Sequence, residues 1–280
     1  MMSGPSTLDL QKHAAEYERQ GYTVIRGLLT KPEAARFLSE VERCAALDSR
    51  KAALNCNGIG FTGEIFIHSL FVRSILTRQD VIDLVSAVAG GDLWISMDQA
   101  VTKHPGAGVF RWHQDNGYNQ LQCEHFQLWI ALTKTRQQNG ALKLVPGSHK
   151  RGRLPHSFKG LGQMEVDEEV GGHVTVDADA GDVILFSSLM LHCTGPNNAD
   201  SKRVAYVAEY MKLSDYAPSA SPPFFIAAEG GFSHPHFVRS APGALSVRNQ
   251  LMYLRPRVAA AARSSARFIR DLIIQLMQIL

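Results

Sequence analysis

The segment Leu93-Trp-Ile-Ser-Met-Asp-Gln-Ala-Val-Thr102 decides the fold class, because the chain changes character where it begins. Its residues alternate in polarity and include β-branched side chains, which is typical of a strand with one buried face. Further short strand candidates follow, separated by turn residues such as Asn139-Gly140 and Gly181-Asp182. They cover residues 126–132, 141–145, 173–176, 183–186 and 204–211. Many short strands with Gly and Pro between them predict an antiparallel sandwich or barrel, a class that includes the jelly roll.

Residues 1–91 are predicted to be mainly helical. A helix over 8–19 ends before Gly21 and leads into a short strand over 22–26. The run Thr30-Lys-Pro-Glu33 is a helix start, with a Thr N-cap, a Pro in the first turn and an early acidic residue. A further helix over 80–88 is expected to end at the following pair of glycines.

Residues 216–280 differ again in composition. The stretch 218–243 is rich in Pro, Ser and Gly and is expected to be an extended loop, long enough to act as a lid. Residues 247–280 are helical in character, and their apolar end predicts packing against the domain or a dimer partner, with membrane-surface attachment as the alternative. We therefore expect one domain over 1–280, mainly β with flanking helices. Its parts are a helical portion (1–91), a jelly-roll core (92–215) and a loop with a C-terminal helix (216–280).

Composition excludes several classes of protein. The net charge is +3, from 29 basic and 26 acidic residues, so no nucleic-acid partner is indicated. The short basic cluster Lys150, Arg151 and Arg153 is interpreted as a solvated loop. The 4 cysteines form no C-x-x-C pair, and no signal peptide or apolar run of membrane-spanning length is present. These features predict a reduced, cytoplasmic protein without a transmembrane span.

The run Trp112-His113-Gln114-Asp115 is the first candidate for chemistry. On an extended backbone, residues two apart project to the same face, so His113 and Asp115 can reach one ion. Taken alone this is weak evidence, because a chain with 11 His and 26 acidic residues produces such a pair by chance.

A second histidine strengthens the case. The run Gly181-Asp-Val-Ile-Leu-Phe-Ser-Ser-Leu-Met-Leu-His192 indicates a turn, a strand, and then a histidine at the far end of another short strand. Two histidines and one carboxylate leave three coordination positions open, which is the arrangement that iron(II) oxygenases use for a co-substrate and dioxygen. A structural zinc site would need a fourth protein ligand, and none is evident.

Arg203 follows His192 by eleven residues and begins the predicted strand 204–211. A turn lies between them, so Arg203 is expected on the neighbouring strand, close to the metal. Its planar guanidinium suits a two-point hold on the distal carboxylate of a dicarboxylate. Thr194, two residues after His192, is placed to share that carboxylate.

The chain resembles the phytanoyl-CoA dioxygenase family in four motifs that occur in the same order. They are Trp-His-Gln-Asp115, Asn139-Gly-Ala-Leu-Lys-Leu-Val-Pro-Gly-Ser-His-Lys150, Gly181-Asp with Phe186, and His192-x-Thr-Gly-Pro-Asn197 followed by Arg203. The resemblance covers residues 93–211 well and extends more loosely to Gly21-Tyr-Thr-Val-Ile-Arg-Gly27. It implies a double-stranded β-helix (a jelly-roll, cupin-like core) and an iron(II)- and 2-oxoglutarate-dependent dioxygenase. Such an enzyme consumes O2, releases succinate and CO2, and is commonly assayed with ascorbate.

Residue by residue, the resemblance implies His113, Asp115 and His192 as iron ligands, and Arg203 with Thr194 at the distal carboxylate of 2-oxoglutarate. It further implies that Gln99 and Lys103 contact the co-substrate and that Trp129 lines the pocket. Related halogenases have a small residue in place of the carboxylate, so Asp115 favours oxygenation. A small organic substrate and hydroxylation, as in biosynthetic tailoring, are the default expectations. The substrate wall is expected from residues 116–122, His125 and the 218–236 loop.

Other functions remain open at this point. The pair His234-Pro-His236 is a weaker metal candidate, since no acidic residue is evident nearby in the sequence. The turn ending at His149 is interpreted as scaffold. The rival from another class is a non-catalytic metal- or ligand-binding protein on the same barrel, and a non-redox metal hydrolase is a third reading.

Overall fold

The computed structural model describes residues 8–47, 57–119, 121, 123–160, 162–217 and 220–243. Its helices are α1 (Leu10–Gln20), α2 (Lys31–Leu47), α3 (Ile65–His68), α4 (Leu70–Leu76), α5 (Gln79–Ala89), α6 (Asp115–Asn119) and the 3₁₀ helix η2 (Ser148–Arg151). Its strands are β1 (Tyr22–Ile25), β2 (Ile59–Gly63), β3 (Leu93–Lys103), β4 (Phe110–His113), β5 (Phe126–Ala131), β6 (Leu142–Leu144), β7 (His156–Phe158), β8 (Met164–Val166), β9 (Val174–Val176), β10 (Val183–Ser187), β11 (His192–Thr194), β12 (Arg203–Lys212), β13 (Phe224–Glu229) and β14 (Phe232–Val238).

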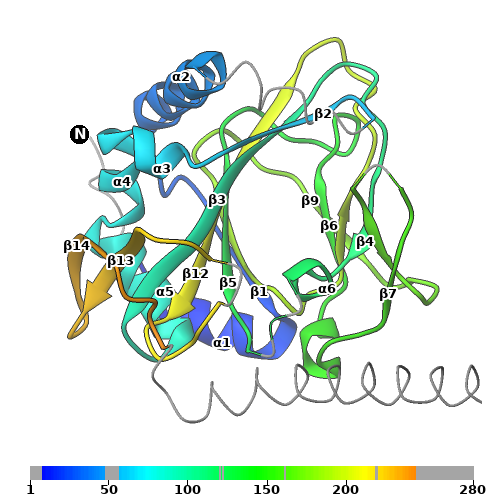
Figure 1. The fold of residues 1–280 in the computed structure, drawn as a ribbon. Helices are drawn as coiled ribbons and strands as arrows, with labels where there is room; N and C mark the ends of the chain where they lie inside the picture. The colour runs from blue at the N-terminus through cyan, green and yellow to red at the C-terminus, as the bar shows by residue number, and fades with distance from the viewer. Residues whose placement is uncertain are drawn as a thin grey trace, which may run out of the picture.

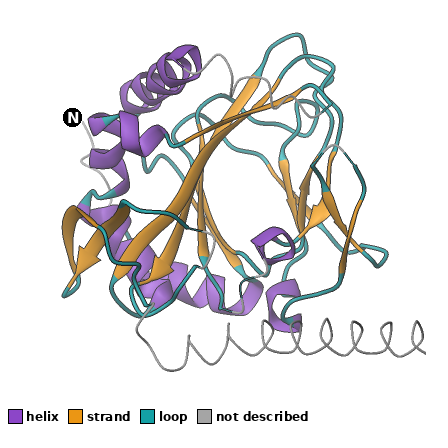
Figure 2. Cartoon of the chain, viewed as in Figure 1, coloured by secondary structure: helices purple, strands orange, loops and turns teal. Residues whose placement is uncertain are grey.

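Two antiparallel sheets make up the core of the molecule. The larger has the order β1-β10-β5-β12-β3-β13-β14, with β2 also paired to β3, and the smaller has the order β4-β11-β6-β9. Figure 1 shows the two sheets facing each other, with α1 to α5 on the outer side of the larger one and α6 near β4 of the smaller one. Figure 2 shows the same view coloured by secondary structure. This is the expected double-stranded β-helix with flanking helices.

Strand β12 shows how alternation separates the two faces of the large sheet. Val204 and Tyr206 belong to the apolar core beneath the helices, whereas Ala205 and the half-buried Val207 belong to the core between the sheets. Since successive side chains on a strand point to opposite faces, Arg203 shares the inner face with Ala205 and Val207. The period of the strand therefore directs Arg203 into the barrel.

The helix that follows Thr30 begins as the sequence predicts. The backbone N–H of Thr30 donates to the Glu33 carboxylate at 2.8 Å, and the N–H of Glu33 donates to the Thr30 hydroxyl at 3.4 Å. This reciprocal pair is a capping box. Helix α5 ends at Gly90 in the left-handed conformation, also as predicted.

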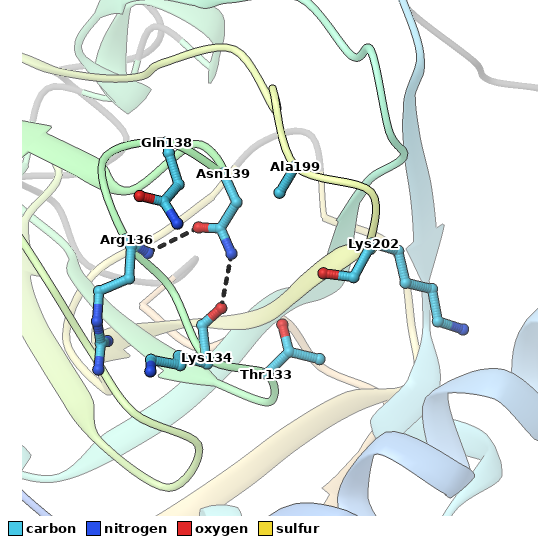
Figure 3. A pocket seen from close by; sticks show the side chains of 8 residues that line it. Thr133, Lys134, Arg136, Gln138, Asn139, Ala199 and Lys202 are labelled. Carbon is cyan, nitrogen blue, oxygen red and sulfur yellow. Dashed lines mark hydrogen bonds between the residues drawn. The ribbon is translucent and has the colours of Figure 1, made fainter.

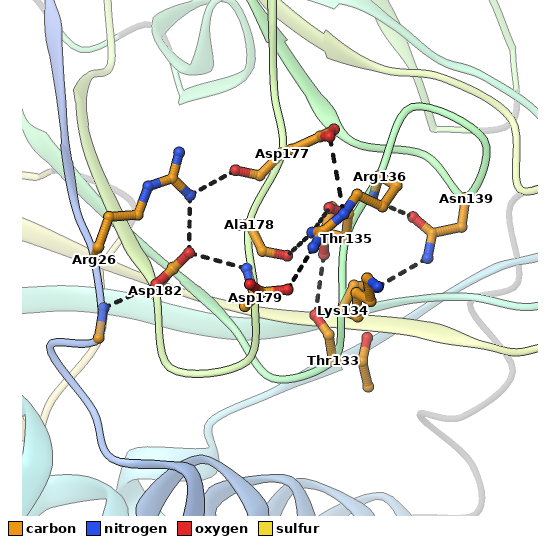
Figure 4. A network of polar contacts seen from close by, with 11 residues as sticks. Arg26, Thr133, Lys134, Thr135, Arg136, Asn139, Asp177, Ala178, Asp179 and Asp182 are labelled. Carbon is orange, nitrogen blue, oxygen red and sulfur yellow. Dashed lines mark hydrogen bonds and ion pairs between the residues drawn. The ribbon is translucent and has the colours of Figure 1, made fainter.

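The Gly181-Asp182 turn holds β1 beside β10 (Figure 4). Gly181 has φ +97°, and a Cβ there would lie 2.2 Å from the Leu29 carbonyl oxygen, so only glycine fits. The Asp182 carboxylate accepts from the Gly27 N–H and from Arg26, both at 2.8 Å. This turn is therefore structural, and it fixes the strand that leads to His192.

The prediction of an extended loop over 218–243 is wrong for most of that segment. Strands β13 and β14 form a hairpin, and β13 pairs with β3 at the end of the large sheet. The composition was misleading because the polar and turn residues flank an apolar strand, Phe224-Phe-Ile-Ala-Ala228. Strand β14 is the edge strand and contains Pro235, which edge strands tolerate. A hairpin built into the sheet does not support the lid hypothesis.

Other departures are local. The sequence did not indicate β2, α3 or α4, which lie between the predicted helices. The predicted C-terminal helix over 247–280 lies outside the described residues. Among the residues that are described, no helix is long and apolar enough to cross a membrane.

Candidate active site

His113, Asp115 and His192 come together between the two sheets. His113 ends β4 and His192 begins β11, and the two residues are paired across these antiparallel strands. Their ring centroids lie 4.1 Å apart. The Asp115 Oδ1 atom is 3.6 Å from His113 Nε2 and 3.7 Å from His192 Nε2. The three side chains offer their ligand atoms to one point, as a bound ion requires.

The local backbone differs from the sequence expectation in two respects. Asp115 is the first residue of helix α6, so the His-x-Asp pair spans a strand end and a helix start rather than one extended run. His192 opens its strand instead of closing it. The convergence results from cross-strand pairing of the histidines, which no local pattern reveals.

Both histidines are oriented by their second ring nitrogen. His113 Nδ1 lies 2.7 Å from the Arg111 carbonyl oxygen, and His192 Nδ1 lies 2.9 Å from the Met190 carbonyl oxygen. A carbonyl only accepts, so each Nδ1 carries the proton and each Nε2 keeps its lone pair. This is the tautomer that a metal ligand needs, with the orienting contact that metal-bound histidines usually have.

The charge states also suit a cation. Burial lowers the pKa of His192 to about 4, and the neighbouring His113 adds to the effect, so His192 is neutral at physiological pH. Burial alone would raise the pKa of Asp115, but the two imidazoles more than offset it and the net shift is downward. The rings of Phe110 and Phe186 lie against His113 and His192, with centroids 4.8 and 4.9 Å apart respectively.

Gln114, between the two ligands, is a supporting residue that the sequence analysis did not single out. Its fully buried amide donates to the Gly152 and Leu189 carbonyls at 2.9 and 2.6 Å and accepts from the Leu154 N–H at 2.8 Å. It thereby ties the turn before Asp115 to the turn before His192. A glutamine whose three contacts are all to distant backbone could not be recognised from local sequence.

The turn that ends at His149 is scaffold, as predicted. The Ser148 hydroxyl accepts from the Leu191 N–H at 2.9 Å, next to His192. His149 packs edge-on against Tyr17 and closely over Gly21, away from the ligand atoms.

Arg203 is fully buried, and its guanidinium is only weakly satisfied by the protein. Nη1 lies 3.5 Å from the Val101 carbonyl oxygen, while Nε and Nη2 have no hydrogen-bond partner. Burial lowers its pKa to about 10, so it remains a cation. A buried charge with two free donors on one edge is costly unless an anion meets it. The residue thus fits a two-point contact with a carboxylate.

Lys103 lies beside Arg203, opposite it in the β3–β12 pairing. Its ammonium donates to Thr194 Oγ1 at 3.0 Å and to the Gly195 carbonyl oxygen. Burial, and secondly Arg203, lower the pKa of Lys103 to about 7. Gly140 makes room for this lysine, since a Cβ there would lie 2.8 Å from Lys103 Cδ. The structure brings Lys103, Thr194 and Arg203 into one cationic cluster.

Gln99 and Trp129 lie two rows further along the same inner face. Both are paired with Val207 of β12, from β3 and β5 respectively. Trp129 is buried in the core between the sheets, and Gln99 is half-buried. Both therefore face the barrel interior.

A buried ion pair on this inner face was not anticipated. Glu209 of β12 lies 2.9 Å from His125 Nε2 and accepts from Gln127 at 3.1 Å and from Ser96 at 2.5 Å. Burial lowers the pKa of His125, but Glu209 reverses the shift, so the net direction is upward. The pKa of Glu209 is lowered, because His125 outweighs the opposing effect of burial. Only His125 was expected at the substrate wall.

A pocket of about 580 Å³ lies elsewhere, between the loop that holds Lys134 and Arg136 and the loop that holds Lys202 (Figure 3). No ligand atom of the triad lines it. Asn139 closes the first loop by accepting from the Arg136 N–H at 2.7 Å and donating to the Lys134 carbonyl at 2.8 Å. Arg136 is engaged by Asp179 at 2.5 Å (Figure 4). The pocket is a feature of the loops near Arg203 and not the reaction site.

The weaker metal candidate does have an acidic partner, contrary to the sequence expectation. Glu229, at the end of β13, lies 2.8 Å from His234 Nδ1 across the hairpin. The glutamate precedes His234 by only five residues, and it was missed because the segment was interpreted as a loop and not as a hairpin that turns between the two.

A His-Asp-His set between the sheets of a double-stranded β-helix, with buried cations beside it, defines the class of mononuclear non-haem iron oxygenases. Comparison with known proteins agrees. Residues 17–205 match the family model described as phytanoyl-CoA dioxygenase (PhyH). The ectoine dioxygenase of Stutzerimonas stutzeri (strain A1501) is 27% identical over 253 residues, covering 77% of this chain and 83% of that protein.

Solved structures show the same fold. The α-ketoglutarate-dependent carbocyclase SnoK from nogalamycin biosynthesis has a TM-score of 0.66 at 23% identity, covering 79% of this chain and 91% of its own. EvdO2 from Micromonospora carbonacea var. aurantiaca, solved with 2-oxoglutarate, has a TM-score of 0.63 at 20% identity, covering 86% and 97%. The chain belongs to the phytanoyl-CoA dioxygenase family, and it is a 2-oxoglutarate-dependent non-haem iron dioxygenase that acts on a small molecule.

Proposed function

We propose that His113, Asp115 and His192 hold the iron(II) of this dioxygenase, and that Arg203 binds the distal carboxylate of 2-oxoglutarate. The observation that carries the proposal is the buried Arg203 guanidinium, whose Nε and Nη2 donors have no partner in the protein. A co-substrate carboxylate would satisfy both donors at once. The iron site is supported by the three converging ligand atoms and by the Nδ1–carbonyl contacts, which leave Nε2 of each histidine free to bind the metal.

Lys103 and Thr194 are proposed to bind the same carboxylate. The Lys103 amine is anchored by Thr194 Oγ1 and is paired with Arg203 across β3 and β12, so a carboxylate bound by Arg203 would lie near it. Gln99 and Trp129, two rows further along the inner face, are proposed to border the co-substrate and the pocket. Together these residues orient the co-substrate and keep water from the buried end of the site.

When bound, iron and 2-oxoglutarate supply the oxidising chemistry, with succinate and CO2 as products. The chain supplies the three proposed iron ligands and the Arg203 guanidinium for the co-substrate. The Asp115 carboxylate would occupy the iron position that a halide takes in related halogenases. Hydroxylation of a small organic molecule is the proposed outcome, in a biosynthetic tailoring role. The ectoine dioxygenase and nogalamycin relatives support that role, because their names place them in small-molecule metabolism.

The substrate is proposed to meet the inner face near α6, His125 and Glu209. No basic cluster suited to an acyl-CoA nucleotide is evident in the sequence, which favours a small molecule. A cytoplasmic location and a homodimer formed through the 247–280 helix are further proposals. They rest on the sequence alone, the first on the cysteine spacing and the second on the apolar C-terminus.

The test is succinate formation by the purified protein with iron(II), ascorbate, 2-oxoglutarate and air. The His113→Ala/Asp115→Ala protein removes two ligands, and the His234→Ala/His236→Ala protein is the matched control that removes exposed histidines elsewhere. We expect slow succinate release by the wild type and the control, and none by the ligand variant. Equal rates in all three proteins would remove the triad from the reaction.

If the wild type forms no succinate without its substrate, anaerobic binding of iron(II) and 2-oxoglutarate tests the proposed site instead. Iron(II) with a chelating 2-oxo acid gives a visible charge-transfer band, which we expect for the wild type and not for His113→Ala/Asp115→Ala. Absence of that band in the wild type would favour the non-catalytic barrel.

A further inference from the structure

The β13–β14 hairpin presents a second cluster of two histidines and one carboxylate, on the larger sheet, whereas the triad histidines lie on strands of the smaller one. His234 and His236 are two residues apart on the edge strand, and Glu229 is the last residue of β13, just before the hairpin turn. In the described part of the chain, only this cluster and the triad bring three such ligand atoms within 4.8 Å of one another. The dioxygenase reaction uses none of these residues.

The geometry matches what a metal ion requires of its ligands. Glu229 Oε2 lies 2.8 Å from His234 Nδ1 and 3.9 Å from His236 Nε2. The two imidazole rings have centroids 4.7 Å apart. The corresponding separations in the triad are 3.6 and 3.7 Å, so the Glu229–His234 contact, a direct hydrogen bond, is the shorter one. Small side-chain rotations would bring all three atoms to bonding distance of one ion.

The tautomer of His236 is already suited to ligation. Its Nδ1 lies 2.9 Å from the His234 carbonyl oxygen, so Nδ1 is the donor and Nε2 faces Glu229 with its lone pair. His234 faces the same carboxylate through Nδ1, where a metal would replace the proton.

The hairpin that carries the ligands is held from two sides. Gln79 of α5 accepts from the Ser233 N–H at 3.0 Å and donates to the Gly231 carbonyl at 3.3 Å. On β14, Phe237 follows His236 and packs on Phe225 of β13, with ring centroids 4.9 Å apart. Pro235, between the two histidines, restricts the backbone further. The ligands are thus preorganised by contacts that do not involve a metal.

We propose that Glu229, His234 and His236 form a second metal site, which takes a divalent transition ion of the zinc class. Imidazole and carboxylate ligands suit zinc, and exposure leaves the remaining positions to water. The side chains of Glu229, His234 and His236 are 42, 63 and 36% exposed, so an ion enters without opening the fold. Bound there, it links β13 to β14 and stabilises the end of the sheet.

The experiment is zinc binding by calorimetry with the His113→Ala/Asp115→Ala protein, in which the buried triad is disabled. We expect about one equivalent of zinc in this background, and its loss when His234→Ala and His236→Ala are added. The matched control adds His104→Ala and His173→Ala, which remove two exposed histidines outside the cluster. That control should keep the zinc equivalent.

A second readout is thermal stability, since a ligand that binds only the native state raises the melting temperature. Zinc should raise the melting temperature of the triad-disabled protein and not that of its His234→Ala/His236→Ala derivative. No zinc binding in the triad-disabled background would overturn the proposal. So would an equivalent that survives loss of His234 and His236. Neither result bears on succinate formation, which reports on the triad alone.

Discussion

The triad and the β14 cluster each contain two histidines and one carboxylate, yet their surroundings differ. The triad lies between two sheets, with its histidines 4 and 6% exposed and the buried Lys103 and Arg203 on strands of the other, larger sheet. The Glu229 cluster lies on an edge hairpin, with side chains 36 to 63% exposed. If both sites bind a metal as proposed, burial and neighbouring charge, and not the type of ligand, distinguish the site that performs the reaction.

The largest effect is expected from removing His192, one of the three proposed metal ligands. We expect His192→Ala to abolish succinate formation, because the ion loses one of its three protein ligands. Circular dichroism should show an intact fold, since Ser148 and Gln114 still hold the adjoining turns. Turnover at the wild-type rate would place the metal elsewhere.

Loss of the Glu209 charge should have the next largest effect, on stability. Glu209→Gln leaves the protonated His125 buried without its partner, which typically costs about 3–5 kcal/mol. Urea unfolding measures the change.

The pH dependence of that loss follows from the pKa shifts. The folded-state pKa of His125 is raised. Its contribution to the free energy of unfolding is therefore complete below the pKa of the unfolded state and is lost as pH rises through the pKa of the folded state. The pKa of Glu209 is lowered, so its contribution is lost only in acid. The difference between wild type and Glu209→Gln should therefore be greater at mildly acidic pH than in alkali. A pH-independent difference would mean that His125 is neutral.

Substitution of Arg203 tests the role of the buried cation. Arg203→Met should raise the 2-oxoglutarate concentration needed for half-maximal succinate release about tenfold or more. A hydrogen bond to a charged group is typically worth ~1.5–3 kcal/mol, and ~1.4 kcal/mol is tenfold. An unchanged requirement would show that the distal carboxylate is bound elsewhere.

The protonation of Lys103 on co-substrate binding gives a smaller but measurable effect. Its pKa of about 7 leaves it mostly neutral at pH 8, and a bound carboxylate should raise that pKa. Anaerobic binding of 2-oxoglutarate at pH 8 should then take up as much as roughly one proton. Calorimetry in buffers of different ionisation enthalpy detects the uptake, and Lys103→Met should abolish it. Buffer-independent heats in the wild type would contradict the proposed contact.

The smallest effect is expected at the exposed cluster in the absence of metal. His234→Ala/His236→Ala should change the free energy of unfolding by no more than about 0.5 kcal/mol, because both side chains are solvent-accessible. Succinate release should be unchanged. A large loss of activity would mean that the hairpin contributes to the reaction after all.

The sequence was informative where one residue type alone meets a local requirement. Thr30 and Glu33 define a cap, Gly181 a close approach, and the period of β12 directs Arg203 inward. It was uninformative where partners are distant in the chain. Glu209 meets His125 only after strands pair, and Gln114 contacts backbone from two remote turns. Glu229 is close to His234 in the chain, but the contact depends on a hairpin that was interpreted as a loop. The hairpin was missed because turn residues dominate the composition around a short apolar strand.

Pro235 has a consequence for the behaviour of the protein in a crowded solution. It sits on the outermost strand of the large sheet, beside an irregularity in the β13–β14 register. A proline offers no N–H there, and a kinked strand is a poor template for another chain. Pro235, which separates the two histidines, therefore also disfavours pairing of this edge strand with a strand of another chain, the kind of association that leads to aggregation.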